Sequence, residues 1–339
     1  MKFLKNKQIN VLAGGGIDLL ALLPCPVKVP FEQAFSGCIE QADGIPDDLL
    51  LLLEGHVNHH LSFYEQLDHT SLKSELPQIL ITPGVNRFLG KDFQEAFIQK
   101  GVYAKEQDYF QRPSNLQNDF VDPNGHYFVL AVNPLVIVVD HARMGDLPIP
   151  KKWEDLMSPI YKGRLAMRAQ KDVFCETVLF NFYQDFGKDG IERLAPNISV
   201  GCHPSEMAKN AGNMKNDNWP PISLIPYFFA KTIRNHDKVT IIWPEDGAIA
   251  SPITMMVQQS ALPKLQPIID ILTCGAMAKL WTNAFFFPPF SDLQHSLHDK
   301  RLKWIGWNFI YSHDAHQMFE NLNEVLCNAM PEKPWEIRP

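Results

Sequence analysis

The sequence lacks most of the short motifs that assign a function directly. None of its six cysteines forms a C-x-x-C pair, which excludes zinc ribbons and thioredoxin-like redox motifs. Gly14, Gly15 and Gly16 belong to neither a G-x-G-x-x-G pattern nor a phosphate-binding loop with its lysine, so we expect no nucleotide site. No apolar run approaches the roughly 18 residues that a membrane span requires.

Positive charge is also scarce. The 31 lysines and arginines are outnumbered by 38 acidic residues, for a net charge of -7, and we therefore expect no nucleic-acid partner. The 19 glycines are fewer than the 26 prolines, a ratio that excludes a simple helical bundle and indicates short elements joined by stiff loops. The 339 residues, 45% of them hydrophobic, suffice for about two domains and exclude a disordered chain.

A convincing signal peptide is missing as well. The apolar stretch Ile17–Leu23 is short, contains Asp18 and is followed by proline rather than by a small-residue cleavage site. Scattered unpaired thiols in a chain with a good core are typical of buried free cysteines in a reducing compartment. These features predict a cytoplasmic protein if the chain is complete, or a mature form whose export signal is missing.

Short apolar runs alternate with amphipathic stretches, which is the pattern of an α/β protein. Long apolar strands near 130–139 and 248–257 flank a self-contained αβ segment. This layout predicts one domain inserted into another, with residues 1–132 plus 249–339 as lobe 1 and residues 133–248 as lobe 2. Two chain crossings would join the lobes, and the cleft between such lobes is a favoured place for a small-molecule site.

Local patterns predict the elements around the candidate site. Ile17–Leu23 reads as a buried strand, Pro24–Pro30 as a stiff loop and Phe31–Gln41 as a helix. Val173–Phe186 has the period of an amphipathic helix, and Gly187 is expected to end it.

A spaced motif lies in the stretch 148–195, which contains the pattern P-x-x-W-x-D-L-x-x-P-x-Y-K-G. Its positions are Pro150, Trp153, Asp155, Leu156, Pro159, Tyr161, Lys162 and Gly163. This stretch resembles the extracellular solute-binding proteins of ABC importers, particularly the ferric-iron type. Asn133–Asp140, Trp243–Met255 and Leu265–Leu272 resemble further segments of that family in the same order.

The resemblance implies a type 2 periplasmic-binding-protein fold, with two α/β lobes joined by two crossover segments that close on a solute by a hinge movement. It implies a binding protein rather than an enzyme, which captures a small solute for an ABC permease in the periplasm or outside the cell. We expect a monomer that needs no cofactor.

The resemblance also places ligand contacts in the loops at the carboxyl ends of the strands. Arg168 is suited to bind a carboxylate or phosphate, because it precedes a helix start whose backbone N–H groups have no helical partner. Its alternative role is that of a surface arginine at a strand end, and Thr82 and Asn86 have the alternative of turn and cap chemistry. The candidate ligand-binding residues are Cys25, Thr82, Asn86, Arg87, Arg168, Gln170, Tyr227, Asp246 and Ser251.

The predicted ligand follows from a departure from the family pattern. Ferric-binding members carry an adjacent tyrosine pair, and the matching place here holds Phe228 and Phe229, preceded by Tyr227. Because phenylalanine cannot ligate iron, we expect a small anionic or polar organic solute.

Two other readings stay open. Cys25 lies between Pro24 and Pro26, and a thiolate there could serve as the nucleophile of a cytoplasmic enzyme on the same fold, although a plain loop residue is the simpler interpretation. An intracellular ligand sensor is the third possibility.

The histidine clusters have a metal-binding alternative. We interpret them as exposed polar positions, because their side chains would converge on one face only in part. The clusters are His56/His59/His60, His295/His298 and His313/His316.

Overall fold

The structure, a computed structural model, describes residues 2–3, 16–55, 76–116, 118–170, 172–213, 215, 218–293, 297 and 299–331. The chain divides into two compact units. Unit 1 consists of Met1–Val132, Pro252–His298 and Gly306–Ala315. Unit 2 consists of Asn133–Ser251, Asp299–Ile305 and His316–Pro339.

Unit 1 is built on a mostly parallel sheet. Its strand order is β1 (Lys2–Phe3), β3 (Leu50–Gly55), β2 (Leu19–Leu23), β4 (Ile79–Pro83) and β11 (Ala248–Val257). The first four strands are parallel, and β11 runs antiparallel to β4, with Ile253 opposite Pro83. The strands β2 and β4 are buried along their whole length, which explains why they read as unbroken apolar runs.

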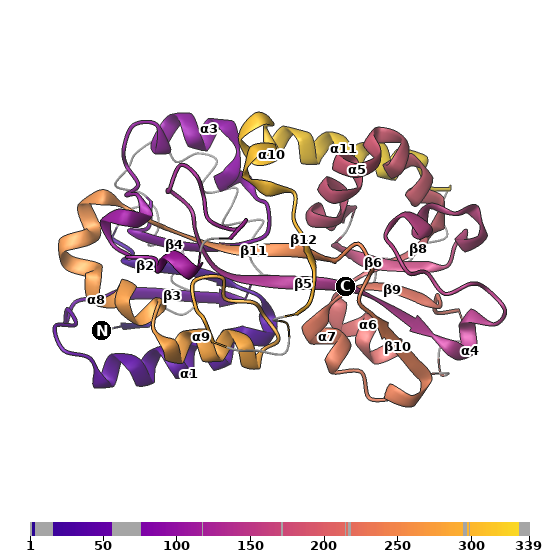
Figure 1. The fold of residues 1–339 in the computed structure, drawn as a ribbon, viewed down its shortest axis with the longest axis horizontal. Helices are drawn as coiled ribbons and strands as arrows, with labels where there is room; N and C mark the ends of the chain where they lie inside the picture. Colours follow the sequence, from indigo (N-terminus) through magenta and orange to yellow (C-terminus); the bar gives the residue numbers. More distant parts are fainter. Residues whose placement is uncertain are drawn as a thin grey trace. The chain divides into compact units, whose positions relative to one another are not determined.

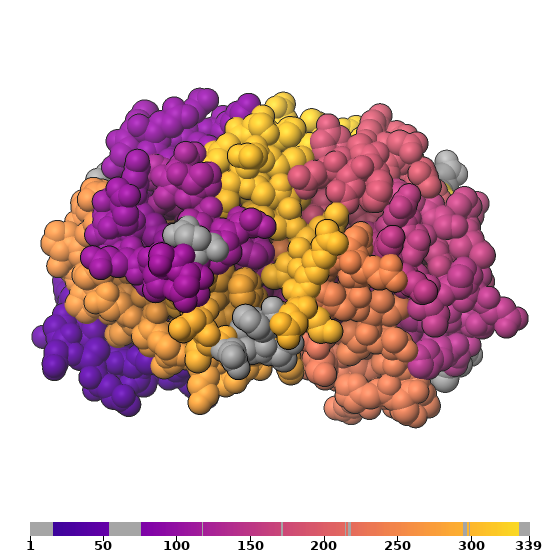
Figure 2. All heavy atoms as spheres, in the orientation of Figure 1, coloured from indigo at the N-terminus to yellow at the C-terminus, as the bar shows by residue number. Residues whose placement is uncertain are grey.

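Helices α1 (Cys25–Gln41) and α9 (Gly275–Asn283) lie side by side on one face of this sheet, with α3 (Lys91–Phe93) on the other (Figure 1). In Figure 2 the indigo atoms of the α1 region adjoin the orange atoms of the α8–α9 region. α1 buries Val27, Phe31 and Phe35, which recur every four residues and form one apolar stripe. Phe31 meets Trp281 of α9 with ring centroids 5.8 Å apart.

The prediction of a stiff loop over Pro24–Pro30 was wrong, because α1 already begins at Cys25. Pro26 lies in the first turn, where backbone N–H groups have no helical partner, so its missing donor costs nothing. Pro30 forfeits one hydrogen bond inside the helix, and the burial of Val27 and Phe31 around it offsets that loss.

Short helical segments complete unit 1. A π-helical turn extends α3. One longer helix comes soon after β11 in the chain, and another follows residues 299–305 of unit 2. The segments are Arg87–Leu89, Gln94–Ile98, Glu106–Asp108, Ser114–Leu116, Gln259–Ala261, α8 (Leu262–Leu272) and α10 (Gly306–Ser312).

Unit 2 has a mixed sheet around three parallel strands. β5 (Phe128–Asp140) enters from unit 1 and pairs antiparallel with β9 (Ile222–Pro226), which is parallel to β6 (Leu165–Gln170). β6 in turn is parallel to β8 (Ile198–Cys202). The sheet is extended by β10 (Val239–Ile242) on β5, β7 (Val173–Phe174) on β6 and β12 (Leu302–Lys303) on β11.

Helices cover both faces of the unit 2 sheet (Figure 1). α5 (Glu176–Leu194) and α11 (Ala315–Ala329) lie on one face, and α6 (Pro204–Asn210) and α7 (Tyr227–Lys231) lie on the other. The first helical stretch of α5 ends at Gly187, as predicted, because this residue has a non-helical φ of 63°, and a second stretch then continues to Leu194. The remaining short segments are α4 (His141–Met144), Glu154–Met157, Pro159–Tyr161, Ala195–Asn197 and His236–Lys238.

The end of the chain differs from the expected division, which placed 249–339 in lobe 1. Residues 299–305 and 316–339 belong to unit 2. The reason is pairing and packing: Leu302 lies opposite Ala248 in a parallel ladder, and Phe319 contacts Phe180 of α5 with ring centroids 6.3 Å apart. In the part of the chain that the structure describes, no helix combines the length and apolarity needed to cross a membrane.

The spaced tryptophan–tyrosine motif stabilises unit 2. The indole Nε1 of Trp153 donates to the carbonyl oxygen of Gly247 at 2.8 Å. The hydroxyl of Tyr161 donates to the carbonyl of Pro148 at 2.7 Å, and the Asp155 carboxylate accepts the Lys151 N–H at 2.7 Å. These side chains fasten loops to the sheet, which is a structural role.

Candidate functional site

The carboxyl ends of β6, β8 and β9 meet at one edge of the unit 2 sheet. Arg168 lies opposite Cys202 in the β6–β8 ladder, and Met167 lies opposite Leu224 in the β6–β9 ladder. Each strand is followed by a helix: α5 follows the β6–β7 hairpin, α6 follows β8 and α7 follows β9. We call this strand edge with its three helix starts the unit 2 edge, and it is the usual place for a ligand in an open α/β sheet.

Arg168 is the central charge of the unit 2 edge. Its Nη1 donates to Oε2 of Glu176, the first residue of α5, at 2.8 Å. Both side chains keep some exposure, 24% for Arg168 and 19% for Glu176. Burial, the largest single effect, would lower the pKa of Arg168, but Glu176 and Cys175 together outweigh it, and the pKa is raised. The arginine is therefore permanently charged, and its ion pair with Glu176 holds its side chain in place.

Cys175 occupies the cap position of α5 beside this ion pair. Burial first and the Glu176 charge second raise the pKa of its thiol to about 11, against the opposing effects of Arg168 and two backbone N–H groups. The thiol is therefore protonated at neutral pH and is a poor nucleophile.

His203 caps α6 on the opposite side of Arg168. Its Nδ1 accepts the backbone N–H of Ser205 at 3.2 Å and lies 2.7 Å from the Ser205 hydroxyl. Burial first and the Arg168 charge second lower its pKa, while Glu206 opposes them. The imidazole is therefore neutral at pH 7, with Nδ1 as the acceptor.

Ser251 of β11 and Gln170 of β6 also belong to unit 2. The hydroxyl of Thr177, in the first turn of α5, donates to the Ser251 hydroxyl over a long 3.5 Å. Gln170 ends β6 and lies opposite Val173 in the hairpin that leads to α5. Both residues therefore lie near the start of α5, as does Arg168.

Tyr227 begins α7 and lies in an aromatic group. Its ring meets Trp243 edge to face at 5.4 Å, and the Lys231 amine lies 5.9 Å from its centroid. Phe228 and Phe229 meet each other edge to face at 5.6 Å. Phe229 also faces the ring of His203 at 5.7 Å, which links α7 to the start of α6.

Asp246 belongs to a turn that holds unit 2 together. Its Oδ1 accepts the backbone N–H of Trp153 at 3.4 Å, and the turn is closed by a 2.9 Å bond from Gly247 N–H to the Pro244 carbonyl. Burial raises the pKa of Asp246, against the opposing effect of backbone N–H groups. Its described contacts are those of a turn residue, which agrees with the turn that the sequence predicts over Pro244, Glu245, Asp246 and Gly247.

The other predicted residues belong to unit 1. Thr82 is fully buried near the end of β4, 3.4 Å from the Thr254 hydroxyl. Asn86 donates to the Thr82 hydroxyl at 3.1 Å, and its Oδ1 accepts the Phe88 N–H at 3.0 Å, which caps the turn that begins at Arg87. Thr82 and Asn86 therefore make the turn and cap contacts of their alternative reading.

Cys25 lies two residues after the end of β2, the parallel neighbour of β4, so it lies at the same sheet edge as Thr82. Its side chain is exposed, and it is the first residue of α1. The nine predicted residues thus form one group at a strand edge of unit 1 and another in unit 2.

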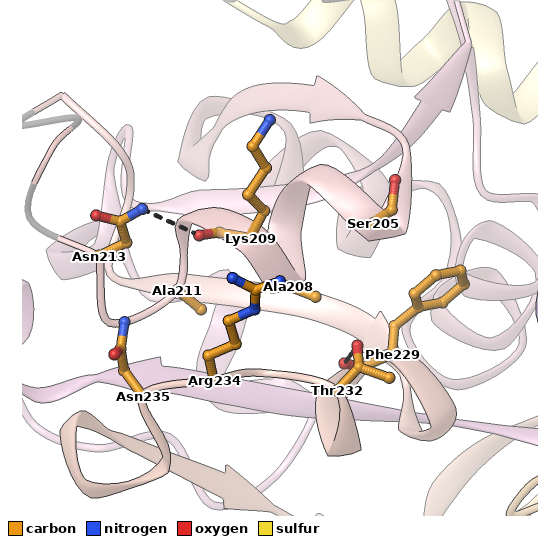
Figure 3. A pocket seen from close by; sticks show the side chains of 9 residues that line it. All are labelled: Ser205, Ala208, Lys209, Ala211, Asn213, Phe229, Thr232, Arg234 and Asn235. Atoms are coloured by element: carbon orange, nitrogen blue, oxygen red, sulfur yellow. Dashed lines mark hydrogen bonds between the residues drawn. The ribbon is translucent and has the colours of Figure 1, made fainter.

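A cavity of about 590 Å³ opens between α6 and α7 of unit 2 (Figure 3). Figure 3 shows the Arg234 guanidinium near the middle of the lining residues, whereas the Lys209 amine points away from it. Lys209 instead lies 3.6 Å from Glu206. The other lining residues are Ser205, Ala208, Ala211, Asn213, Phe229, Thr232 and Asn235.

Buried polar contacts hold the rim of this cavity. Asp140 forms an ion pair with Arg143 and accepts the Gly212 N–H at 2.8 Å. Arg143 also donates to the Asn213 carbonyl at 2.6 Å, and the Asn235 side chain donates to the Gly212 carbonyl at 3.1 Å. The volume lies in the range of small-ligand pockets, so this cavity is a second candidate site.

The histidine clusters lie partly outside the described residues. That applies to His56, His59, His60, His295 and His298. Nδ1 of His313 donates to the Phe309 carbonyl at 2.9 Å, and His316 lies 3.8 Å from Glu320. Among described residues, no three His, Cys, Asp or Glu side chains gather closely enough to hold a metal ion.

Sequence reasoning missed Glu176 and His203. A signal for both existed: an acidic residue in the first turn of a helix, and a polar residue directly before a proline at a helix start. Nothing in the sequence indicated that these two side chains would flank Arg168, since they are contributed by different helices.

Residues 74–313 match the profile of a family described as bacterial extracellular solute-binding protein. No curated protein sequence matches the chain. Many solved structures match the chain, among them three that match it over most of its length. A ferric binding protein from Campylobacter jejuni is 14% identical, with 88% of this chain and 95% of that chain covered and a TM-score of 0.61.

The substrate binding protein of an ABC transporter from Agrobacterium tumefaciens is 13% identical, covering 93% of this chain and 96% of its own, with a TM-score of 0.63. A two-component system protein that mediates signal transduction is 16% identical, covering 89% and 100%, with the same TM-score of 0.63. At such identities the likeness shows the fold, a mixed α/β periplasmic-binding-protein fold of type 2, and this prediction is confirmed.

Proposed function

The chain belongs to the bacterial extracellular solute-binding protein family, and from this premise we propose that it captures a small anionic or polar organic solute. The observation that carries the proposal is the positioned Arg168 at the unit 2 edge, ion-paired to the first residue of α5. A cation next to a helix start offers both a charge and backbone donors to an anion.

Glu176 occupies the place that a solute carboxylate would take. A guanidinium has five N–H donors, and Glu176 accepts from Arg168 through a single bond at 2.8 Å. Because both side chains remain partly exposed, a solute anion can reach the arginine and compete with Glu176. Binding then exchanges one carboxylate for another on Arg168, and the displaced, partly exposed Glu176 carboxylate can turn to water.

The neighbouring groups favour an organic anion. Neutral His203, the Thr177 and Ser251 hydroxyls and the ring of Tyr227 offer hydrogen bonds and an aromatic surface. Phe228 and Phe229 stand where ferric-binding relatives carry tyrosines, and phenyl rings supply no oxygen ligand. This chemistry supports a carboxylate or phosphate ester over a bare ferric ion.

We further propose that the solute is delivered to the permease of an ABC importer, in the periplasm or outside the cell. The family description and the printed function of the Agrobacterium tumefaciens neighbour support this role. Proteins of this fold close around a ligand by a hinge movement. The strands β5 and β11, which pass from one unit into the other, are the proposed hinge segments of a monomer.

The test combines a ligand screen with three variants. Thermal shift with citrate, succinate, inorganic phosphate, sulfate, glycine and ferric chloride identifies the stabilising class, and titration calorimetry then measures affinity. A charge-assisted arginine contact is worth about 1.5–3 kcal/mol, so Arg168→Ala should weaken binding by roughly 10- to 150-fold. Glu176→Gln should strengthen it, because the competing carboxylate is removed.

Arg234→Ala is the matched control, since Arg234 lies in the cavity of Figure 3. It should bind as wild type does. If Arg234→Ala loses affinity while Arg168→Ala keeps it, the solute site is that cavity. If ferric chloride alone stabilises the protein, the proposed ligand class is wrong.

A cysteine enzyme is the competing function, because Cys25 is exposed at the start of a 17-residue helix. The stabilising compound should be recovered unchanged after incubation with the protein. A product that disappears in Cys25→Ser would replace the binding function by an enzymatic one. Binding without a permease partner would favour a ligand sensor, the role suggested by the description of the two-component neighbour.

A further inference from the structure

Cys38 of α1 and Cys274, the residue that precedes α9, both belong to unit 1, and their thiols interact with each other. We propose that these two thiols are the site of an intramolecular disulfide that forms when the protein meets an oxidising compartment. This inference concerns a covalent modification and does not depend on which solute the protein binds.

The geometry follows from the pairing of the two helices. Phe31 of α1 contacts Trp281 of α9, and the helices lie side by side (Figure 1). Cys38 lies seven residues after Phe31, and Cys274 lies seven residues before Trp281. Two helical turns in opposite directions along an antiparallel pair bring the two cysteines to the same level.

Both cysteines also lie on the faces that the helices turn toward each other. In α1, Phe31, Phe35 and Cys38 are spaced by four and then three residues, so they share one face. Cys274 caps α9: its carbonyl accepts the Ala278 N–H at 3.0 Å, and both Ala278 and Trp281 are buried. The chain therefore directs both thiols into the α1–α9 seam.

The electrostatics of the pair agree with direct contact. Burial first, then the charge of Cys274 and a hydrogen bond with its thiol raise the pKa of Cys38. A disulfide needs the two β-carbons close together on opposed backbones, and a shared hydrogen bond between thiols is the state nearest to it. Both side chains are only partly buried, so an oxidant can reach the pair.

The compartment supplies the oxidant. The family is extracellular by description, and disulfides form and persist outside the reducing cytosol. The free-thiol reading of the sequence therefore changes for these two cysteines. One thiolate attacks a small-molecule disulfide and releases one thiol; the second then attacks the mixed disulfide and releases another. Two protein thiols are oxidised and one disulfide reagent is reduced to two thiols.

The crosslink would act mainly on the unfolded chain. It joins residues 38 and 274 of unit 1, and the loop that it closes contains the whole segment Asn133–Ser251 of unit 2. Closing so long a loop removes conformational freedom from the denatured ensemble. The oxidised protein should therefore unfold at a higher temperature than the reduced one.

The experiment uses the full chain incubated with oxidised glutathione, followed by thiol counting and peptide mapping under non-reducing conditions. The reactive thiols should fall from six to four, with a peptide containing Cys38 linked to one containing Cys274. The melting temperature should rise, and dithiothreitol should reverse both changes.

Three serine variants separate this pair from the other cysteines. Cys25→Ser should still form the link, because Cys25 lies at the opposite end of α1. In Cys38→Ser and in Cys274→Ser, the remaining thiols should form no intramolecular disulfide. A different cysteine pair in the linked peptides, or glutathione adducts on Cys38 and Cys274 without ring closure, would overturn the proposal.

Discussion

Asp122 is expected to be the most sensitive polar position of unit 1. Its carboxylate is 3% exposed and accepts four hydrogen bonds. Its Oδ2 accepts the backbone N–H groups of His126 and Tyr127 at 2.8 and 3.0 Å, and its Oδ1 accepts the Asn124 N–H at 3.0 Å. The fourth donor is the Tyr311 hydroxyl at 2.6 Å, so one side chain ties the segment Gly306–Ala315 to the rest of unit 1.

The cost of Asp122→Ala can be worked out from these partners. The N–H groups of Asn124 and His126 lie on partly exposed residues and can turn to water. The Tyr127 N–H loses its partner in a fully buried place, whereas the Tyr311 hydroxyl lies on a partly buried side chain. A buried donor left unpaired costs about 1–3 kcal/mol, so the loss at Tyr127 alone should lower the free energy of unfolding by about 1–3 kcal/mol.

Tyr311→Phe is the matched control, because it removes one donor and leaves the other three in place. Burial first and Asp122 second raise the pKa of Tyr311, which keeps its hydroxyl protonated as a donor. The loss should be about 1.5–3 kcal/mol, the range for a hydrogen bond to a charged group. The double variant should lose less than the sum of the two singles.

Urea unfolding followed by tryptophan fluorescence is the assay, because Trp307 stacks on Tyr127 with ring centroids 5.6 Å apart and reports on this region. Suppose that Asp122→Ala lowers the free energy of unfolding by less than about 1 kcal/mol, the lower limit for one unpaired buried donor. The buried network would then contribute little to stability. Additive losses in the double variant would show that Asp122 and Tyr311 act independently.

Thiol labelling at pH 8 should modify Cys25 far faster than Cys175. The pKa of Cys175, raised to about 11, leaves a thiolate fraction on the order of 100-fold below that of an ordinary thiol, and burial slows it further; equal rates would contradict the buried geometry. Gly212→Ala should destabilise the protein more than Gly163→Ala, as measured by urea midpoints. Both glycines have a positive φ, 69° and 66°, but only at Gly212 would a new Cβ meet neighbours, Asn235 Cβ at 3.0 Å and its carbonyl oxygen at 3.2 Å. Equal midpoints would mean that the cavity rim relaxes freely.

Much of the fold could be predicted because the strands are continuous apolar runs. β2, β5 and β11 are buried almost throughout, so local composition and position along the chain agree. The spaced tryptophan–tyrosine motif then led to the family and the fold. The start of α1 was harder to predict, since Pro26 and Pro30 are helix breakers in isolation and are tolerated here by their positions.

The candidate site also has a part that could be predicted from the sequence and a part that could not. The sequence identified Arg168 at a strand end, because an apolar run stops there and a helix pattern follows. Its ion pair with Glu176 and its closeness to His203 depend on how the hairpin and two helices pack onto three strands. Such contacts join residues that no periodic pattern relates.

What the amino-acid sequence determined by itself was the class of structure: alternating apolar and amphipathic stretches, free of the motifs of nucleotide or nucleic-acid binding. Only the tertiary structure decided that residues 299–305 add a strand to unit 2, that Thr82 and Asn86 serve a turn, and that Cys38 meets Cys274. Strand and helix patterns arise from short-range periodicity, whereas these pairings arise from the packing of distant segments, which leaves no periodic trace in the chain.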